Sequence, residues 1–211
     1  MENKVIKRIY EALEIKHSDL TFELMRENDF NWEGSDPKLC TLNSAKGLEF
    51  DIVLMPHMNK ENGLLVLFSC NTCPFVIAWE DRYHTIAKLC KEKSIGMAAI
   101  NSNAARREGV DSMEEMKKHA KEKGYEFNYM LDENAKLADL FGATKTPQAF
   151  LFNKDLKLVY TGAIDDNLKY AEKVKSPYLV NAINNMVNKM KIHPNTTNAL
   201  GCSIKKVAVK K

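Results

Sequence analysis

Runs of apolar residues along the chain predict buried strands, and apolar residues spaced three and four apart predict amphipathic helices. Residues 64–68 and 95–100 are short, almost entirely apolar runs, as expected for strands covered on both faces. Between them, residues 74–92 carry apolar side chains at helical spacing behind Pro74, and proline is favoured in the first helical turn. The pattern therefore predicts a strand, a helix and a strand in succession.

The same alternation continues through the rest of the chain. The predicted helices cover residues 111–123, 135–141 and 178–190, and the predicted strands cover 127–131, 148–152 and 156–160. Asp111 or Ser112 would cap the first of these helices, Gly142 would end the second, and the last two strands would form a hairpin. Helices that alternate with apolar strands indicate an α/β fold, in which a central mixed β-sheet is flanked by helices on both faces.

A different pattern precedes these elements. Apolar residues on one face predict a helix over residues 5–25, and turn formers follow at 28–37. Residues 40–42 and 48–54 flank Gly47 and predict a β-hairpin. The expected parts are an N-terminal helical extension (1–38), one main domain (39–193) and a C-terminal tail (194–211). The extension either packs on the domain, which is the simpler interpretation, or mediates dimers, so the sequence does not fix the oligomeric state.

Composition and charge exclude several classes of protein. The chain has 211 residues, of which 45% are hydrophobic, and its net charge is 31 − 28 = +3. Such a length can bury a core without disulfide bonds, and so small a net charge argues against a disordered protein. The last nine residues hold four lysines and no acid, which leaves the remainder at 3 − 4 = −1. We therefore expect no nucleic-acid-binding face. The basic tail could contact an acidic partner, but a solvated terminus is the simpler interpretation.

The sequence contains no stretch that is apolar enough to cross a membrane. The longest strictly apolar runs, such as residues 64–68, are far below the roughly 20 residues that a spanning helix needs. The first residues mix charged and apolar side chains and lack the apolar centre of a signal peptide. We expect a soluble protein without a membrane partner and a cytoplasmic location, or a periplasmic one if a leader precedes this sequence.

Two of the five cysteines form the most informative pattern in the chain. Cys70 and Cys73 make a Cys-x-x-Cys pair between a predicted buried strand and the helix that begins at Pro74. The free N–H groups and the dipole at a helix N-terminus favour thiolate over thiol, which lowers a cysteine pKa from about 8.5 into a reactive range. Two thiols at this spacing can also close into a disulfide, so attack, mixed disulfide and resolution can occur within one motif.

Simpler interpretations of the cysteines stay open. An odd number of cysteines argues against a disulfide scaffold, and the pair could be half of a zinc site or two inert buried thiols. The other cysteines are single and the histidines are scattered, so no metal site is expected. Cys90 lies on the apolar face of its helix and is expected in the core, and Cys40 is expected to be inert. Asn101 and Asn103 end a strand, where they could reach the thiols, although loop capping is the simpler role.

Several short motifs together resemble one family. They lie at residues 64–76, 99–103, 131–133, 142–147, 150–153, 160–167 and 201–205. With these motifs, residues 40–206 resemble the thioredoxin-like superfamily. Within it, they are most similar to the bacterial redoxin group (AhpC/TSA-type, thiol-disulfide isomerase-like), whose members carry a Cys-Asn-x-Cys-Pro motif. The first 38 residues do not share the resemblance.

The resemblance implies a thioredoxin-like fold and a redox site built on the cysteine pair. It also implies a cis peptide at Pro147 beside the cysteines, so that Thr146 offers a free backbone edge to an incoming disulfide peptide. An ordinary proline at the start of a strand is the simpler alternative. The implied partners are protein or small-molecule disulfides and a thiol partner that donates or accepts electrons. No cofactor is expected, because the sequence has neither a dinucleotide fingerprint nor a phosphate loop.

The sequence leaves open which cysteine attacks. Motif order makes Cys70 the nucleophile and Cys73 the resolving thiol, whereas counting from the end of the strand places Cys73 nearest the helix N-terminus. The motif lacks the tryptophan of thioredoxin's Trp-Cys-Gly-Pro-Cys. It also lacks the hydroxyl residue that peroxiredoxins place three positions before their attacking cysteine, since Cys70 stands there for Cys73 and Leu67 for Cys70.

Cys202 is a candidate accessory thiol. Relatives of the redoxin group commonly end in a Gly-Cys-x-Ile-Lys-like tail, which residues 201–205 resemble. If the tail is mobile, Cys202 could reach the active pair as a resolving or relay cysteine. If the tail packs on the domain, Cys202 could be a small apolar filler.

These observations lead us to expect a thiol-disulfide oxidoreductase that uses Cys70 and Cys73, with Thr146 and Pro147 shaping the docking edge. Two alternatives belong to other functional classes. One is a peroxiredoxin-like thiol peroxidase, and the other is a non-catalytic thiol module that binds a metal or another protein. The fold alone does not decide among them, because one fold hosts several functions.

Overall fold

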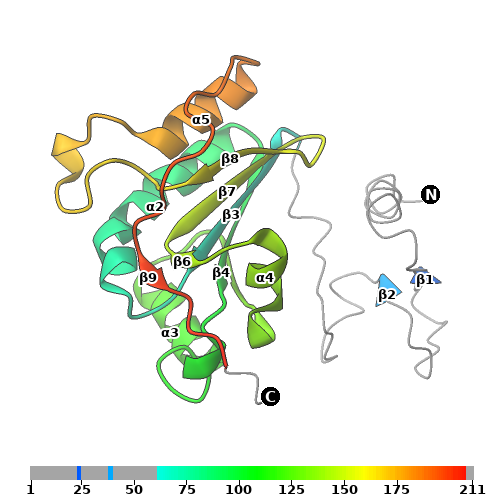
Figure 1. Ribbon diagram of the computed structural model, residues 1–211, viewed down its shortest axis with the longest axis vertical. Helices are drawn as coiled ribbons and strands as arrows, with labels where there is room; N and C mark the ends of the chain where they lie inside the picture. Colours follow the sequence, from blue (N-terminus) through cyan, green and yellow to red (C-terminus); the bar gives the residue numbers. More distant parts are fainter. Residues whose placement is uncertain (1–22, 25–37, 40–60, 208–211) are drawn as a thin grey trace. The chain divides into compact units, whose positions relative to one another are not determined.

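The computed structural model describes residues 23–24, 38–39 and 61–207 of the chain (Figure 1). The chain divides into two units, Met1–His57 and Met58–Lys211. Almost all that is described belongs to the second unit, which holds the cysteine pair. The limits expected for the extension, the domain and the tail stay predictions.

The first unit contains two short strands among its described residues. They are β1 (Glu23–Leu24) and β2 (Lys38–Leu39), which pair in parallel. The helix predicted over 5–25 is therefore wrong at its end. Residues 23–24 pair with residues 38–39, and the spacing of apolar residues does not reveal such a pairing. The rest of that helix, the turn at 28–37 and the hairpin over 40–54 lie outside the described residues.

The second unit contains a five-stranded mixed sheet with the strand order β5-β4-β3-β7-β8 (Figure 1). The strands are β3 (Gly63–Ser69), β4 (Ile95–Asn101), β5 (Asn128–Leu131), β7 (Gln148–Asn153) and β8 (Leu158–Gly162). β3, β4 and β5 run parallel, whereas β7 is antiparallel to both β3 and β8. Parallel neighbours need a crossover connection, which explains the helices between β3, β4 and β5.

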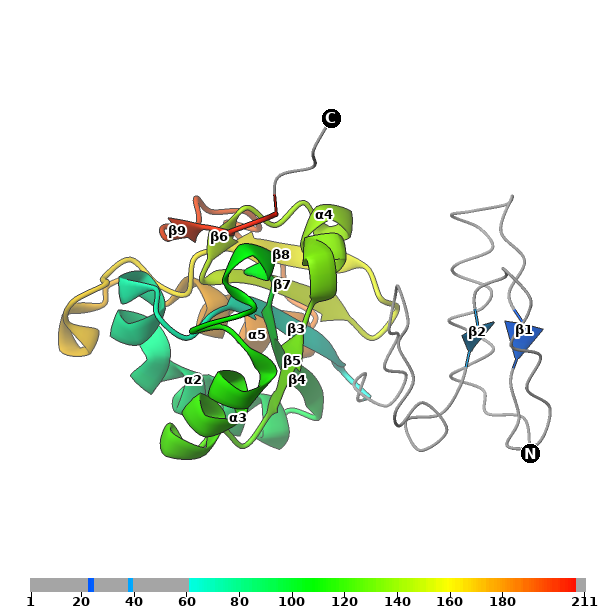
Figure 2. The ribbon, with the colours of Figure 1, turned by 90° about the horizontal axis from the view of Figure 1, so that it is seen from below.

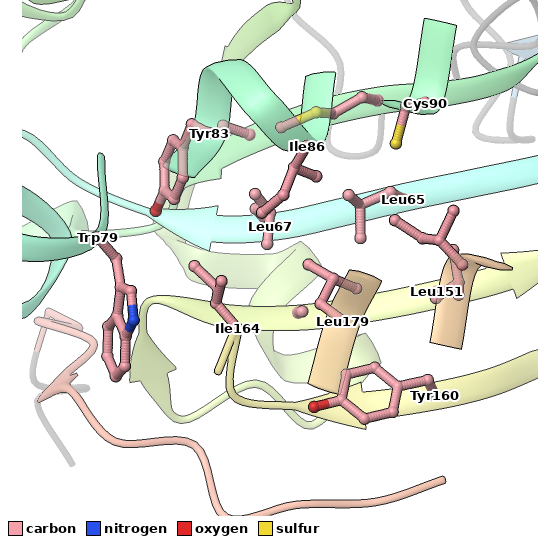
Figure 3. Packing of buried hydrophobic residues seen from close by; sticks show 14 of the residues in the cluster. Leu65, Leu67, Trp79, Tyr83, Ile86, Cys90, Leu151, Tyr160, Ile164 and Leu179 are labelled. Atoms are coloured by element: carbon pink, nitrogen blue, oxygen red, sulfur yellow. The ribbon is translucent and has the colours of Figure 1, made fainter. Parts of the chain in front are cut away.

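Helices cover both faces of this sheet (Figure 2). α2 (Pro74–Glu92) and α5 (Tyr178–Val187) pack on one face, where their apolar side chains join those of β3 and β7 in the larger core cluster (Figure 3). α4 (Lys136–Phe141) packs on the opposite face in a second cluster, and α3 (Met113–Glu122) lies beside β5. The predicted α/β architecture is confirmed.

The position of β3 in the middle of the sheet explains why its residues are apolar on both faces. Leu65 and Leu67 enter the cluster formed with α2 and α5, whereas Val66 and Phe68 enter the cluster formed with α4. All four are at most 3% exposed. Each such side chain contributes about 1.5–3 kcal/mol by leaving water, so both faces of β3 are held firmly. The C-terminal end of β3, where the cysteine pair begins, is consequently a fixed point of the fold.

The predicted elements of this unit are confirmed, with small shifts at their ends. α3 is capped by Ser112, whose hydroxyl accepts from the N–H of Glu115, and α5 ends at Val187 rather than at 190. α4 ends at Gly142, which has φ +68. Two strands were not predicted, β6 (Lys145–Thr146) and β9 (Cys202–Ser203), which pair antiparallel. A strand of two residues is too short to show a periodicity.

The described part of the C-terminal tail is attached to the domain along its length. Thr197 hydrogen-bonds with the N–H of Ala163 and with the hydroxyl of Tyr160 at 2.9 and 2.7 Å. Further along, Ile204 is 8% exposed and donates its N–H to the carbonyl of Thr144. In the part of the chain that the structure describes, no helix has the length and apolar character needed to cross a membrane.

We predict that Gly162→Ala destabilises the domain by separating the tail from β8. Gly162 has φ +141, and an added Cβ would lie 2.2 Å from Oγ1 and 2.4 Å from the carbonyl oxygen of Thr197. We expect the free energy of unfolding, measured by urea titration, to fall by about 2 kcal/mol or more. Gly109→Ala is the control, since its added Cβ would come no closer than 3.9 Å to Arg106. An equal loss in both variants would contradict the prediction.

Candidate active site

The junction between β3 and α2 positions the cysteine pair. β3 ends at Ser69 and α2 begins at Pro74, so Cys73 is the N-cap residue of the helix. Its extended backbone (φ −71°, ψ 123°) lets its carbonyl accept the first helical hydrogen bond, from the N–H of Ile77 at 3.0 Å. The N–H groups of the first helical turn have no partners within the helix. Cys73 makes no side-chain capping hydrogen bond to them, and these N–H groups favour a negative charge near the start of the helix.

Both sulfurs of the pair are buried against Thr146. Cys70 is 2% exposed and Cys73 is 4% exposed. Cys70 Sγ lies 3.5 Å from Thr146 Oγ1, and Cys73 Sγ, when protonated, donates to the Thr146 carbonyl oxygen at 3.2 Å. The Thr146-Pro147 peptide is cis, as the resemblance implied. The structure thus brings together the four residues that the sequence indicated: Cys70, Cys73, Thr146 and Pro147.

The tail brings a third thiol to the same place. β9 pairs with β6 so that Cys202 stands opposite Thr146 and Ser203 opposite Lys145 (Figures 1 and 2). Cys73 Sγ lies 3.2 Å from the carbonyl oxygen of the same Thr146, and Cys202 lies near enough to Cys73 to lower its pKa. Cys202 is half-buried, whereas Cys70 and Cys73 are almost inaccessible. The site is therefore a cluster of three thiols, rather than the pair alone.

Within this cluster, the neighbouring groups favour the charged form of Cys73 and the neutral forms of Cys70 and Cys202. The thiol of Cys70 makes the largest contribution, and with the Cys202 thiol and the N–H groups of Val76 and Cys202 it lowers the pKa of Cys73 from 9.0 to about 4, against the effect of burial. The pKa of Cys70 is raised far above its ordinary value, because its proton is held in the bond to Cys73 and because it is buried. Burial, followed by the neighbouring Cys73, raises the pKa of Cys202.

Asp111, which the sequence indicated only as a possible helix cap, binds the loop between the two cysteines. Asp111 is fully buried and accepts a hydrogen bond from the N–H of Asn71 at 2.9 Å. Its two oxygens also accept from the side-chain amides of Asn101 and Asn103, at 2.8 and 3.0 Å. The asparagines thus reach the thiols only through Asp111 and Asn71. No local pattern distinguishes such a residue from an ordinary cap.

Other residues considered in the sequence serve the core or lie outside the site. Cys90 is 1% exposed within the larger core cluster, as expected (Figure 3). Cys40 lies outside the described residues. Within the described ranges, no group of three or more histidine, cysteine, aspartate or glutamate side chains is arranged to hold a metal ion.

Comparison with known proteins gives close matches in sequence and structure. The Redoxin family model matches residues 55–175. An uncharacterized conserved protein from Geobacillus kaustophilus has 32% sequence identity over 72% of this chain and 82% of its own, with a TM-score of 0.67. A hypothetical protein from Sinorhizobium meliloti 1021 has 28% identity over 72% of this chain and 84% of its own, also with a TM-score of 0.67.

A more distant match extends the comparison of the fold. A thioredoxin-like protein solved in its oxidized form has 15% identity over 67% of this chain and 88% of its own, with a TM-score of 0.53. No curated protein matches the chain. The thioredoxin-like α/β fold expected from the sequence is confirmed, and the family supports thiol-based redox chemistry in general. The matched residues 55–175 are more than half of the 211 residues and include Cys70 and Cys73, so this chain belongs to the Redoxin family.

Proposed function

We propose that this protein is a thiol-disulfide oxidoreductase in which Cys73 is the attacking thiolate and Cys70 a resolving thiol. The observation that carries the proposal is the position of Cys73 at the N-terminus of α2, where Cys70, Cys202 and Val76 lower the pKa of its thiol. A thiolate is the nucleophile in thiol-disulfide exchange, and these groups keep Cys73 in that form at neutral pH. The substrates would be protein or small-molecule disulfides.

The proposed reaction transfers two electrons in two exchange steps. The Cys73 thiolate attacks one substrate sulfur, a mixed disulfide forms, and the other substrate sulfur leaves as a thiolate. Cys70 then loses its proton to that leaving thiolate and attacks Cys73 Sγ. A Cys70–Cys73 disulfide forms, and the second substrate sulfur leaves. A thiol partner would reduce the protein again, and the reverse sequence would oxidise a substrate dithiol.

The position of Cys70 also bears on the alternative of peroxide reduction. Cys70 stands three positions before Cys73, at the position where peroxiredoxins carry a hydroxyl residue. Its buried thiol lies beside Thr146, which also contacts Cys73 Sγ, and it lowers the pKa of Cys73. Both properties suit disulfide exchange, and we therefore favour that reaction over peroxide reduction.

We predict different roles for the two cysteines of the pair. Cys73→Ser should reduce insulin disulfides no faster than the dithiothreitol present in the assay, because a hydroxyl cannot replace the attacking thiolate. Cys70→Ser should still attack, since Cys73 is intact, and mass spectrometry should locate the disulfide that it forms at Cys73. Cys90→Ala is the control, because Cys90 belongs to the core rather than to the site. Attack at the wild-type rate in Cys73→Ser would refute the assignment.

We predict that the alkylation of Cys73 is nearly independent of pH in the neutral range. With the pKa of Cys73 lowered to about 4, its thiolate is fully formed at neutral pH and is lost only as the pH falls toward that value. The alkylation rate of a free cysteine instead falls about tenfold per pH unit below its pKa. Cys70→Ala removes the group that lowers the pKa of Cys73 most, and it should therefore move the alkylation curve of Cys73 to higher pH. Identical curves for Cys73 and free cysteine would show that the thiolate is not stabilised.

We predict a reduction potential on the oxidising side of thioredoxin's, which is about −270 mV. The hydrogen bonds to the Cys73 thiolate exist only in the reduced protein, so they stabilise the dithiol form against the disulfide. Equilibration with glutathione buffers, read by alkylation and mass spectrometry, measures the potential. A value more negative than that of thioredoxin would show that these hydrogen bonds do not govern the equilibrium.

A further inference from the structure

The edge that the resemblance assigned to a docking peptide is filled by the protein's own tail. β9 pairs with β6, so that Cys202 occupies the position opposite Thr146. The approach is close at Gly201, where an added Cβ would lie 2.3 Å from the carbonyl oxygen of Thr146 and 2.7 Å from its carbonyl carbon. Only a residue without a side chain fits there. The sequence Gly201-Cys202 therefore lets the tail strand lie directly against the site.

Contacts on the C-terminal side of Cys202 hold it in this place. Ile204 is 8% exposed in the cluster with Phe68 and Phe150, and its N–H donates to the carbonyl of Thr144 at 3.1 Å. The N–H of Lys205 donates to Asn103 Oδ1 at 2.9 Å, and the Lys205 carbonyl accepts from Ala105 at 2.8 Å. Cys202 is thus delivered by an ordered strand, and its approach to Cys73 does not depend on chance encounters of a loose tail.

The environment of Cys202 differs from that of Cys70 in two respects that matter for exchange. Cys202 is half-buried, so its sulfur is closer to water than that of Cys70. Lys145 and Lys205 also act electrostatically on Cys202 and favour its thiolate. Both thiols also meet at Thr146, whose carbonyl oxygen lies 3.2 Å from Cys73 Sγ. Cys70 Sγ lies 3.5 Å from Thr146 Oγ1, and Cys202 in β9 pairs with Thr146, which places each thiol beside the sulfur that a resolving thiol has to attack.

We propose that Cys202 is a second resolving thiol, which β9 holds against Cys73 in competition with Cys70. This inference rests on the proposed function. After Cys73 has formed the mixed disulfide, Cys202 gives its proton to the first substrate sulfur, which has already left as a thiolate, and attacks Cys73 Sγ. A Cys73–Cys202 disulfide forms, the bond to the substrate sulfur breaks, and that sulfur leaves as a thiolate. Two electrons pass from the two cysteines to the substrate disulfide, as in resolution by Cys70.

The Cys70–Cys73 and Cys73–Cys202 disulfides differ in how a thiol partner can reduce them. In the Cys73–Cys202 disulfide, one sulfur lies at the half-buried position in β9, where a thiol partner can attack it. Alternatively, Cys70 attacks Cys73 Sγ, expels the Cys202 thiolate and moves the disulfide to the buried pair. Oxidation thus gives one of two alternative disulfides, both of which use the Cys73 sulfur. One ends at the half-buried Cys202 and the other at the buried Cys70.

Variants that lack one or both resolving thiols test this inference. The reduced wild-type protein and the variants Cys70→Ser, Cys202→Ser and Cys70→Ser/Cys202→Ser are exposed to oxidised glutathione, and intact-mass spectrometry follows the glutathione adduct at Cys73. Each single variant should clear the adduct through its remaining thiol, and the double variant should clear it at least about tenfold more slowly, since no intramolecular thiol remains beside Cys73. Peptide mapping of Cys70→Ser should find the Cys73–Cys202 linkage.

The outcomes separate this inference from the proposed function. If Cys70→Ser retains the adduct as long as the double variant does, Cys202 does not resolve and the inference is overturned, whereas the assignment of Cys73 stands. If the double variant acquires no adduct at Cys73, the proposed function fails, and this inference fails with it.

A glycine substitution tests the part played by β9. In the Cys70→Ser protein, Gly201→Ala should displace the strand and make the adduct persist as in the double variant, although Cys202 is still present. Gly109→Ala in the same protein is the matched control, because its added Cβ has room and lies outside the site. Clearance by the Gly201→Ala protein at the rate of the control would overturn the positioning role of β9.

Discussion

In the proposed function, the structure has to keep the Cys73 thiolate away from water and still stabilise its charge. Cys73 is 4% exposed, and a buried charge without partners costs several kcal/mol. The groups that lower its pKa come from three separate parts of the chain: the end of β3, the first turn of α2, and β9 in the tail. The fold therefore brings a strand end, a helix start and a tail strand to one point. Thr146 lies at that point and contacts both sulfurs of the pair.

A buried carboxylate, that of Asp111, connects these parts. Asp111 accepts from the N–H of Asn71, between the two cysteines, and from the side chains of Asn101 and Asn103 at the end of β4. Loss of this acceptor would leave three buried donors unpaired, at a cost of about 1–3 kcal/mol each. Asn103 in turn accepts from the N–H of Lys205, three residues beyond Cys202. One polar network thus fixes both the loop of the pair and the tail that approaches it.

The sequence predicted what depends on local pattern. The apolar run of β3 and the helical spacing of α2 placed the cysteine pair at a strand-to-helix junction, and counting from the strand end placed Cys73 nearest the helix. The position of β9 and the role of Asp111 could not be predicted, because a two-residue strand has no periodicity and a buried aspartate resembles a helix cap. Both depend on contacts between distant segments, as does β1, where a helix was wrongly predicted.

The position of β9 also bears on which disulfides would reach Cys73 in the proposed reaction. An extended peptide that pairs with Thr146 needs the backbone groups that β9 uses, so it has to displace the strand. Returning the buried Ile204 to water alone costs about 1.5–3 kcal/mol, which corresponds to roughly 10- to 150-fold weaker binding of the peptide. A compact disulfide that reaches the Cys73 sulfur without pairing with Thr146 avoids this cost. The tail would therefore favour small or locally exposed disulfides over those within an extended polypeptide.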